Sequence, residues 1–251
     1  MFSRFLLPFS GLAVAVAAWH FAVAWSPGTL VPTPLQAALA IVELAERGLL
    51  FRYVVASLYR VTWGYLAALF IAVPAGVLLG LWRRAEVSVN PMLQVLRPIS
   101  PLAWIPMAIL WFGVGDTAAI FLIFLASVLP LTLTTIHAVH NIEGIHLAAG
   151  RNFGLTHREL VRNVVLPAIL PQLLVGMRIT LGIAWLVVVA AEMIAVSSGL
   201  GFLIVDARNA GNRYDMVVAG MILIGLIGVA LDLIMRRFER LPGVRWGYAA
   251  E

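Results

Sequence analysis

The chain has 251 residues, of which 62% are apolar and 12% are charged. A soluble domain is about 45–50% apolar and about 25% charged, so this chain has too little polar surface to cover a globule, and part of its apolar surface must face lipid. All 17 basic residues are arginine, and cysteine is absent. These two absences exclude a Walker lysine, a Schiff-base lysine, a thiolate nucleophile and a cysteine zinc site.

Six apolar stretches approach the length of about 20 residues that a helix needs to cross a bilayer. In chain order they are Phe5–Trp25, Val61–Trp82, Leu102–Val114, Ala118–Val139, Ile169–Val196 and Met216–Met235. If the N-terminus is cytoplasmic, the inner connections hold Arg4, Arg83, Arg84, Arg97, Arg151, Arg158, Arg162, Arg236, Arg237, Arg240 and Arg245, and the outer ones hold Arg47, Arg52, Arg60, Arg208 and Arg213. The positive-inside rule therefore predicts that both termini are cytoplasmic, and the net charge of +5 needs no nucleic acid to explain it.

The first stretch, the loop that follows it and the third stretch are unusual. The first is longer than the apolar core of most signal peptides, which favours an uncleaved anchor over a cleaved signal. The outer loop Ser26–Arg60 opens with Pro27, Pro32 and Pro34 and then shows helical spacing, which predicts an interfacial helix ending near Gly48. The third stretch is short and follows a proline-rich approach, so we expect it to be buried against other helices.

The connection between the fourth and fifth stretches, His140–Pro167, is too polar for the membrane. Thr156 and Glu159 have the spacing of a capping box, which predicts a helix start. The following apolar residues share one face and are Leu160, Val161, Val164 and Val165, with Arg158, Arg162 and Asn163 opposite. An upstream apolar set at helical spacing consists of Ile142, Ile145, Ala149 and Phe153, and it ends at Gly154. The pattern predicts two short helices bent at a glycine, which either dock into another protein or lie on the bilayer surface.

This segment resembles the EAA motif of membrane subunits of binding-protein-dependent ABC importers. The motif reads Glu-Ala-Ala, three residues, Gly, nine residues, Ile, one residue, Leu-Pro. Ala149, Gly154, Leu166 and Pro167 match it, whereas Ala148, Gly150 and Val164 replace its glutamate, second alanine and isoleucine. The glycine bend and the helix end at Leu-Pro are therefore expected here as well. The resemblance implies that these positions, with Arg158 and Glu159, couple the chain to an ATPase, but without any salt bridge from the motif glutamate.

Further fragments resemble the branch of these importers that includes nitrate, sulfonate and taurine permeases. They are Ser57–Tyr65, Leu96–Pro101, Ile105–Pro106, Ile109–Gly113, Ala184–Trp185, Ala191–Met193 and Gly199–Ile204, within a similar region from about Pro32 to Arg240. The resemblance implies a homodimeric permease, two ATPase subunits that bind ATP and Mg²⁺, and an extracytoplasmic solute-binding protein. This chain itself then needs no cofactor and no metal.

Five residues are candidates for lining a solute pathway, namely Ser100, Trp104, Arg178, Trp185 and Glu192. Ionisable side chains inside a membrane are costly and normally face protein or water. Arg178 and Glu192 lie 14 positions apart, or about 21 Å along a helix, and therefore cannot pair with each other. Arg178 would suit an anionic solute if it faces the pathway, but it can also extend to the headgroups, and the tryptophans can equally be interfacial or core residues.

Three other patterns have simpler interpretations. Gly113–Ala118 fits the dinucleotide pattern G-x-G-x-x-A, but it links two apolar stretches and predicts a tight turn. The histidines at 137, 140, 146 and 157 have no metal-ligand spacing with a carboxylate, so packing is favoured over metal binding. Gly76 and Gly80 are spaced for close helix packing.

These features predict an all-α integral membrane protein of about six spans that forms one permease domain, residues 1–251, in a bacterial plasma membrane. The expected function is passage of a small solute, such as nitrate, a sulfonate or taurine, into the cytoplasm, driven by a separate ATPase. The alternative is a secondary transporter or channel that works without ATP, with the EAA-like segment as a surface helix pair. A membrane-embedded enzyme would need a catalytic cluster, and the sequence pattern offers none.

Overall fold

The computed structural model describes residues 3–26, 28 and 30–240, and its regular elements in that part of the chain are all helical. The helices are α1 (Ser3–Ala24), α2 (Pro34–Glu46), α3 (Leu49–Leu81), α4 (Arg83–Leu96), η1 (Pro101–Trp104), α5 (Ile105–Phe112), α6 (Asp116–His140), α7 (Gly144–Asn152), α8 (His157–Leu160), η2 (Val161–Val165), α9 (Leu166–Glu192), α10 (Leu200–Asn209) and α11 (Tyr214–Glu239). The prediction of an all-α fold is confirmed. Pro27 and Arg245, used above for the outer loop and the orientation, lie outside the described residues.

The described residues contain four helices that are long and apolar enough to cross a membrane: α3, α6, the continuous helix His157–Ala195 and α11. The pair formed by α4 and Pro101–Phe112 passes the same test together but is bent by 81°, so it counts as a fifth span only if it crosses as a broken helix. The apolar part of α1 that the structure describes in full, Ser10–Ala24, is shorter. The protein is therefore multi-pass, and the count of six stays a prediction.

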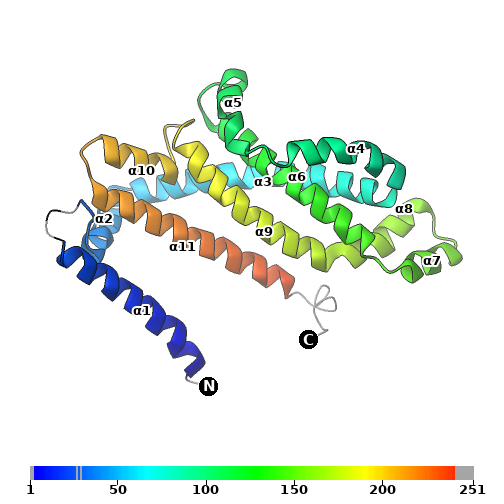
Figure 1. Ribbon diagram of the computed structural model, residues 1–251, viewed down its shortest axis with the longest axis horizontal. Helices are drawn as coiled ribbons and strands as arrows, with labels where there is room; N and C mark the ends of the chain where they lie inside the picture. The colour runs from blue at the N-terminus through cyan, green and yellow to red at the C-terminus, as the bar shows by residue number, and fades with distance from the viewer. Residues whose placement is uncertain (1–2, 27, 29, 241–251) are drawn as a thin grey trace.

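The central pair of helices, α3 and α6, run parallel and in close contact (Figure 1). A Cβ added to Gly64, Gly76 or Gly80 would lie 2.5–2.7 Å from the Cβ of the residue 59 positions later, Ile123, Thr135 or Val139 respectively. The constant offset shows that the two helices keep one register over several turns. Lipid gives no hydrophobic driving force for helix association, so van der Waals contact between closely packed backbones stabilises the pair. The close helix packing predicted from the spacing of Gly76 and Gly80 is confirmed.

Helix α9 packs antiparallel to α6 and α3, and α11 packs antiparallel to α9. A Cβ on Gly176 would meet Thr134, and one on Gly228 would meet the indole of Trp185. The bundle consequently has two distinct ends (Figure 1). We call them the α10 end, with α2, α10 and the starts of α3 and α6, and the α7 end, with α7, α8 and the finish of α6.

The helix expected to lie at the interface before Gly48 is present as α2, and it starts at a capping box between Thr33 and Gln36. Gly48 adopts the left-handed conformation, with φ of 69°, and α3 begins directly after it. The helix that contains the second apolar stretch, α3, begins at Leu49, so residues 49–60 of the expected outer loop are helical. Arg60, assigned above to an outer loop, is consequently buried inside the bundle at 2% exposure.

The expectation that the third stretch is buried is also wrong for the single chain. Helix α5 projects from the bundle (Figure 1), and only its Ile105 and Ala108 are buried. Leu110 is 74% exposed and Trp111 is 52% exposed. The physical reason is that α5, only eight residues long, packs mainly against α6 and leaves its other faces uncovered.

Candidate functional site

The segment at the α7 end has the two-part form that the sequence predicts. Helix α7 ends at Asn152 with Phe153 as its C-cap, Gly154 is left-handed with φ of 74°, and Thr156 is the N-cap of the second helix. The Thr156 hydroxyl accepts from the backbone N–H of Glu159, and the Glu159 carboxylate accepts from the backbone N–H of Thr156 at 2.9 Å. The capping box and the glycine bend are both confirmed.

The apolar residues of the two helices differ in burial. On the second helix, Leu160 and Val165 are buried, as their common face predicts. On α7, Ile145 is 69% exposed and Phe153 is 86% exposed. An aromatic ring this exposed at the end of a helix has no packing role within the described chain, so the apolar face of α7 is available to a partner.

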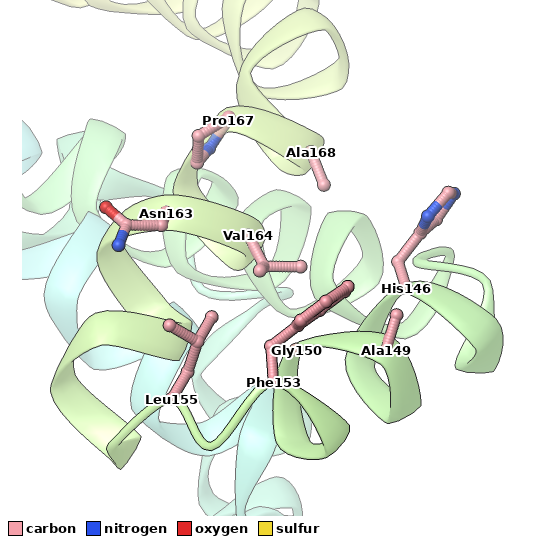
Figure 2. A pocket seen from close by; sticks show the side chains of 9 residues that line it. All are labelled: His146, Ala149, Gly150, Phe153, Leu155, Asn163, Val164, Pro167 and Ala168. Carbon is pink, nitrogen blue, oxygen red and sulfur yellow. The ribbon is translucent and has the colours of Figure 1, made fainter.

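A shallow cavity of about 570 Å³ lies between the two helices. Figure 2 shows His146, Ala149 and Gly150 along one wall and Val164, Pro167 and Ala168 along the other. Gly150 favours this approach, because an added Cβ would lie 2.5 Å from Leu160 Cδ1 and the leucine side chain would have to shift. The Gly150 carbonyl also accepts from the Leu155 N–H at 3.2 Å, which closes the bend.

The Leu-Pro end expected at Leu166 and Pro167 is absent, and this prediction is wrong. The second helix instead continues into α9, and together they form one helix, His157–Ala195. A π-helical turn, Val161–Val165, lies directly before the proline. A wider turn accommodates a ring that would otherwise clash with the carbonyl four residues earlier, so the chain passes Pro167 without a break. The segment is thus rigidly joined to a membrane span.

The remaining EAA-like positions lie on or beside this element. Ala148 and Ala149 are exposed on α7, and Arg158 and Glu159 are exposed on the first turn of the second helix. Val164 is half-buried at the cavity. Ala148 therefore presents a methyl group at the surface position where the EAA motif has a carboxylate.

A second polar site, at the α10 end, was largely missed by sequence reasoning. Glu192, at the end of α9, is fully buried, and its Oε1 accepts from the Arg60 guanidinium at 2.6 Å. Its Oε2 accepts from the Ser57 hydroxyl at 2.8 Å and from the Gly201 N–H at 3.0 Å. Arg60 also donates to Asp116 at 2.8 Å and to the carbonyl of Ser198 at 2.7 Å. This ionic cluster joins α3, α6 and the loop after α9.

Two glycines allow that loop to close over the Glu192 carboxylate. Gly199 has φ of 106°, and an added Cβ would lie 2.3 Å from the Glu192 carboxylate. A Cβ on Gly201 would lie 2.2 Å from the carbonyl oxygen of Val189. A buried charge is tolerated only when its partners are complete, and here the glycine backbone supplies one of them. The two glycines of the fragment Gly199–Ile204 are thus explained by the close packing of this loop on Glu192 and Val189.

The sequence did contain a signal for this cluster. Arg60 follows Ser57 by three positions, so both fall on one helix face beside the apolar run of α3. Counting Arg60 as a loop residue hid its pairing with the intramembrane Glu192. Asp116 was assigned only to the turn between Gly113 and Ala118, which the structure confirms as the connection between α5 and α6.

The five pathway candidates are not gathered in one place. Trp104 lines a cavity between η1 and α6, and the Ser100 hydroxyl caps η1 by accepting from the Leu102 N–H. Trp185 is buried and its indole N–H donates to the Ile224 carbonyl at 3.0 Å. Arg178 Nε lies 3.2 Å from Glu239. Glu192 lies at the other end of α9, so Arg178 and Glu192 do not pair.

Within the described residues, no group of three or more His, Asp or Glu side chains is arranged to hold a metal ion. His140 Nε2 lies 3.2 Å from Glu86 on α4, and His146 lines the cavity beside α7. These side chains take part in surface contacts at the α7 end.

Several long apolar helices, held together by close packing at glycines, define an integral membrane protein of several spans. Residues 72–242 match the family described as binding-protein-dependent transport system inner membrane component. The chain belongs to this family, and it is a permease subunit rather than a catalytic one.

Relatives support the same assignment over most of the chain. The taurine transport system permease protein TauC of Escherichia coli is 32% identical, covering 91% of this chain and 86% of that protein. The bicarbonate transport system permease protein CmpB of Synechococcus elongatus is 34% identical, covering 94% of this chain and 88% of that protein. Among solved structures, an inward-facing conformation of the MetNI methionine ABC transporter matches with a TM-score of 0.62 at 25% identity, covering 75% of this chain and 95% of that one.

Proposed function

We propose that this chain is the membrane subunit of an ABC importer for a small anion, coupled to a separate ATPase through the segment Gly144–Pro167. The observation that carries the proposal is the exposed apolar face of α7, which packs across the Gly154 bend against a second helix that continues without a break into a membrane span. A partner that moves α7 would push on the second helix through the contact between Gly150 and Leu160, and α9 would follow because it is the same continuous helix.

The chemistry of the segment fits an apolar docking mode. Phe153 and Ile145 present large exposed apolar surfaces, and the adjoining cavity is lined mainly by apolar side chains. Ala148 offers no charge, so the contact with an ATPase would depend on burial of Phe153 rather than on a salt bridge. Truncation of a buried aromatic anchor is among the most costly changes at an interface.

The same proposal includes the other subunits. The α7 end faces the cytoplasm, where ATPase subunits bind ATP and Mg²⁺, and the α10 end faces an extracytoplasmic binding protein. A second copy of this chain forms the pathway between two protomers. The exposed apolar residues of α5, including Leu110 and Trp111, give that second copy a surface to cover.

The solute is proposed to be a small oxyanion or sulfonate. The named relatives transport taurine and bicarbonate, which share a compact negatively charged oxygen group. Nitrate and short alkyl sulfonates have the same character and belong to the same test panel.

Uptake into proteoliposomes tests the proposal. The permease is reconstituted with its co-purified ATPase and binding protein, and labelled taurine, methanesulfonate, nitrate and bicarbonate are supplied with ATP inside or outside the vesicles. We expect saturable uptake of one of these anions that requires ATP on the α7 side. Uptake at the same rate without ATP would overturn the proposal and favour a secondary transporter.

A matched pair of glycine variants locates the coupling. Gly154→Val forces a β-branched residue into a left-handed backbone, which costs about 1–3 kcal/mol locally. Gly144→Val, at the other end of α7, adds the same side chain where space is open and the backbone is unstrained. We expect ATP-driven uptake to fall at least tenfold for Gly154→Val and far less for Gly144→Val. Equal activity of both variants would contradict coupling through this bend.

A further inference from the structure

The cavity that Trp104 lines carries two basic side chains in an otherwise mainly apolar wall. It has a volume of about 640 Å³ and lies between the end of α4, η1, the second half of α6 and Ile183 of α9. This volume is in the range of about 300–1,000 Å³ that small-molecule sites occupy. Most of the wall is apolar, and its polar side chains are Arg97, Thr134 and His137.

The charge in this cavity has one sign. Arg97 and His137 are the ionisable groups of the lining, and the lining contains no carboxylate. Within the described residues, the exposed Arg97 forms no ion pair, as is true of other exposed arginines, whereas Arg60, Arg178 and Arg213 each have a carboxylate partner. An arginine that faces an apolar cavity without a counter-ion favours an anion that supplies one.

The earlier candidate for this role, Arg178, is occupied elsewhere. Its Nε lies 3.2 Å from Glu239 and 3.9 Å from Asp232 on α11. Its charge is therefore balanced by two carboxylates, and a solute anion would have to displace them. Arg97 has no such competition.

Deepening the function proposed above, on which this inference rests, we propose that the cavity of Arg97, Trp104, Thr134 and His137 is a transient binding site for the transported anion. The Arg97 guanidinium can hold an oxyanion or sulfonate group through two parallel hydrogen bonds, and the Thr134 hydroxyl can donate a third. Trp104, Leu129 and Ile183 enclose the short carbon chain of an organic anion. The mouth beside Arg97 stays exposed, so the anion can leave, as transport requires.

The absence of cysteine from the chain allows a direct test of the cavity's charge. Thr134→Cys introduces its only thiol, and the assembled complex is treated with sulfonatoethyl methanethiosulfonate or with its trimethylammonium counterpart. Modification of this chain is followed by intact mass. The measured quantity is the ratio of the anionic to the cationic reaction rate, compared among the parent, Arg97→Gln and Arg84→Gln backgrounds. Arg84, on the first turn of α4, is an exposed arginine away from the cavity and serves as the matched control.

We expect Arg97→Gln to lower this ratio at least fivefold and Arg84→Gln to leave it within twofold of the parent. In proteoliposomes, Arg97→Gln should reduce anion uptake at least tenfold, and Arg97→Lys should restore only part of it, because the charge returns without the two parallel hydrogen bonds of a guanidinium. An unchanged rate ratio together with unchanged uptake in Arg97→Gln would overturn the site while leaving the importer proposal intact. Failure of the unmodified complex to take up any anion with ATP would instead overturn the proposed function itself.

Discussion

The two ends of the bundle handle their functional residues in opposite ways. At the α10 end, Arg60 and Glu192 are almost completely buried, and their polar groups have close partners from α3, α6 and the loop after α9. At the α7 end, Phe153 and Ile145 are largely exposed, and the chain bends at a single left-handed glycine. The α10 end is held together by a buried ion pair, and the α7 end has exposed apolar side chains without a partner in the described chain.

This difference indicates that the α10 end contributes to stability and that the α7 end contributes to coupling. A buried ion pair is costly to open, because each charge separated from its partner remains desolvated. We therefore expect the α10 end to be the fixed part of the chain. The α7 end can exchange partners at low cost, since the Phe153 side chain is 86% exposed and buries little surface within the chain. Changes at the α10 end should act on stability, and changes at the α7 end should act on coupling.

Removing Glu192 should have the largest effect on stability. Glu192→Ala leaves Arg60 buried with only the partly exposed Asp116 as its carboxylate partner, and breaking a buried pair costs about 3–5 kcal/mol. Thermal unfolding in detergent measures the loss. The double variant Arg60→Met/Glu192→Met removes both charges and should recover most of it. A double variant as unstable as the single one would contradict the ion-pair explanation.

A methyl group on Gly201 should have the next largest effect. Gly201→Ala places a Cβ 2.2 Å from the Val189 carbonyl oxygen, and overpacking of this kind costs about 1–3 kcal/mol. Gly182→Ala, on α9, adds the same methyl group into open space and is the control. We expect a lower unfolding temperature for Gly201→Ala and no decrease for Gly182→Ala. Equal unfolding temperatures would show that the loop after α9 is not held tightly against Val189.

Truncation of Phe153 should separate coupling from stability. Phe153→Ala is expected to change the free energy of unfolding by less than about 0.5 kcal/mol, because the ring is exposed. The same variant should sharply reduce the ATPase activity that co-purifies with the chain. Phe70→Ala, at an 83% exposed position on α3, is the matched control. If the Phe153→Ala variant still co-purified with the ATPase, Phe153 would not be part of the docking surface.

The smallest effect is expected at the contact between α2 and the loop before α11. The Arg213 guanidinium donates to Glu43 at 2.7 Å and lowers the pKa of that carboxyl group. Because the folded pKa lies below the ordinary value, the contact stabilises the protein fully above about pH 4.5 and loses this effect as the pH falls through the lowered pKa. Glu43→Gln should therefore lower the unfolding temperature slightly at pH 7 and not at pH 3, as thermal scans at the two pH values would measure.

The sequence predicted those features that depend on local pattern. The capping box of Thr156 and Glu159, the bend at Gly154 and the close approach at Gly76 and Gly80 all follow from short-range spacing. The ion pair of Arg60 and Glu192 joins residues 132 positions apart, and no periodicity reports such a contact. The continuation of the helix past Pro167 depends on a π-helical turn, which rules for proline in regular helices do not anticipate.

The central claim is that an ATPase docks on the α7 segment, and site-specific cross-linking tests it most directly. Phe153→Cys and Phe70→Cys, each the only thiol of the chain, are treated in native membranes with a short thiol-to-amine cross-linker, and the attached proteins are identified by mass spectrometry. We expect a Walker-motif ATPase to be cross-linked to the thiol at position 153 and not to the thiol at position 70. An ATPase attached equally from both positions, or from neither while uptake proceeds normally, would contradict it.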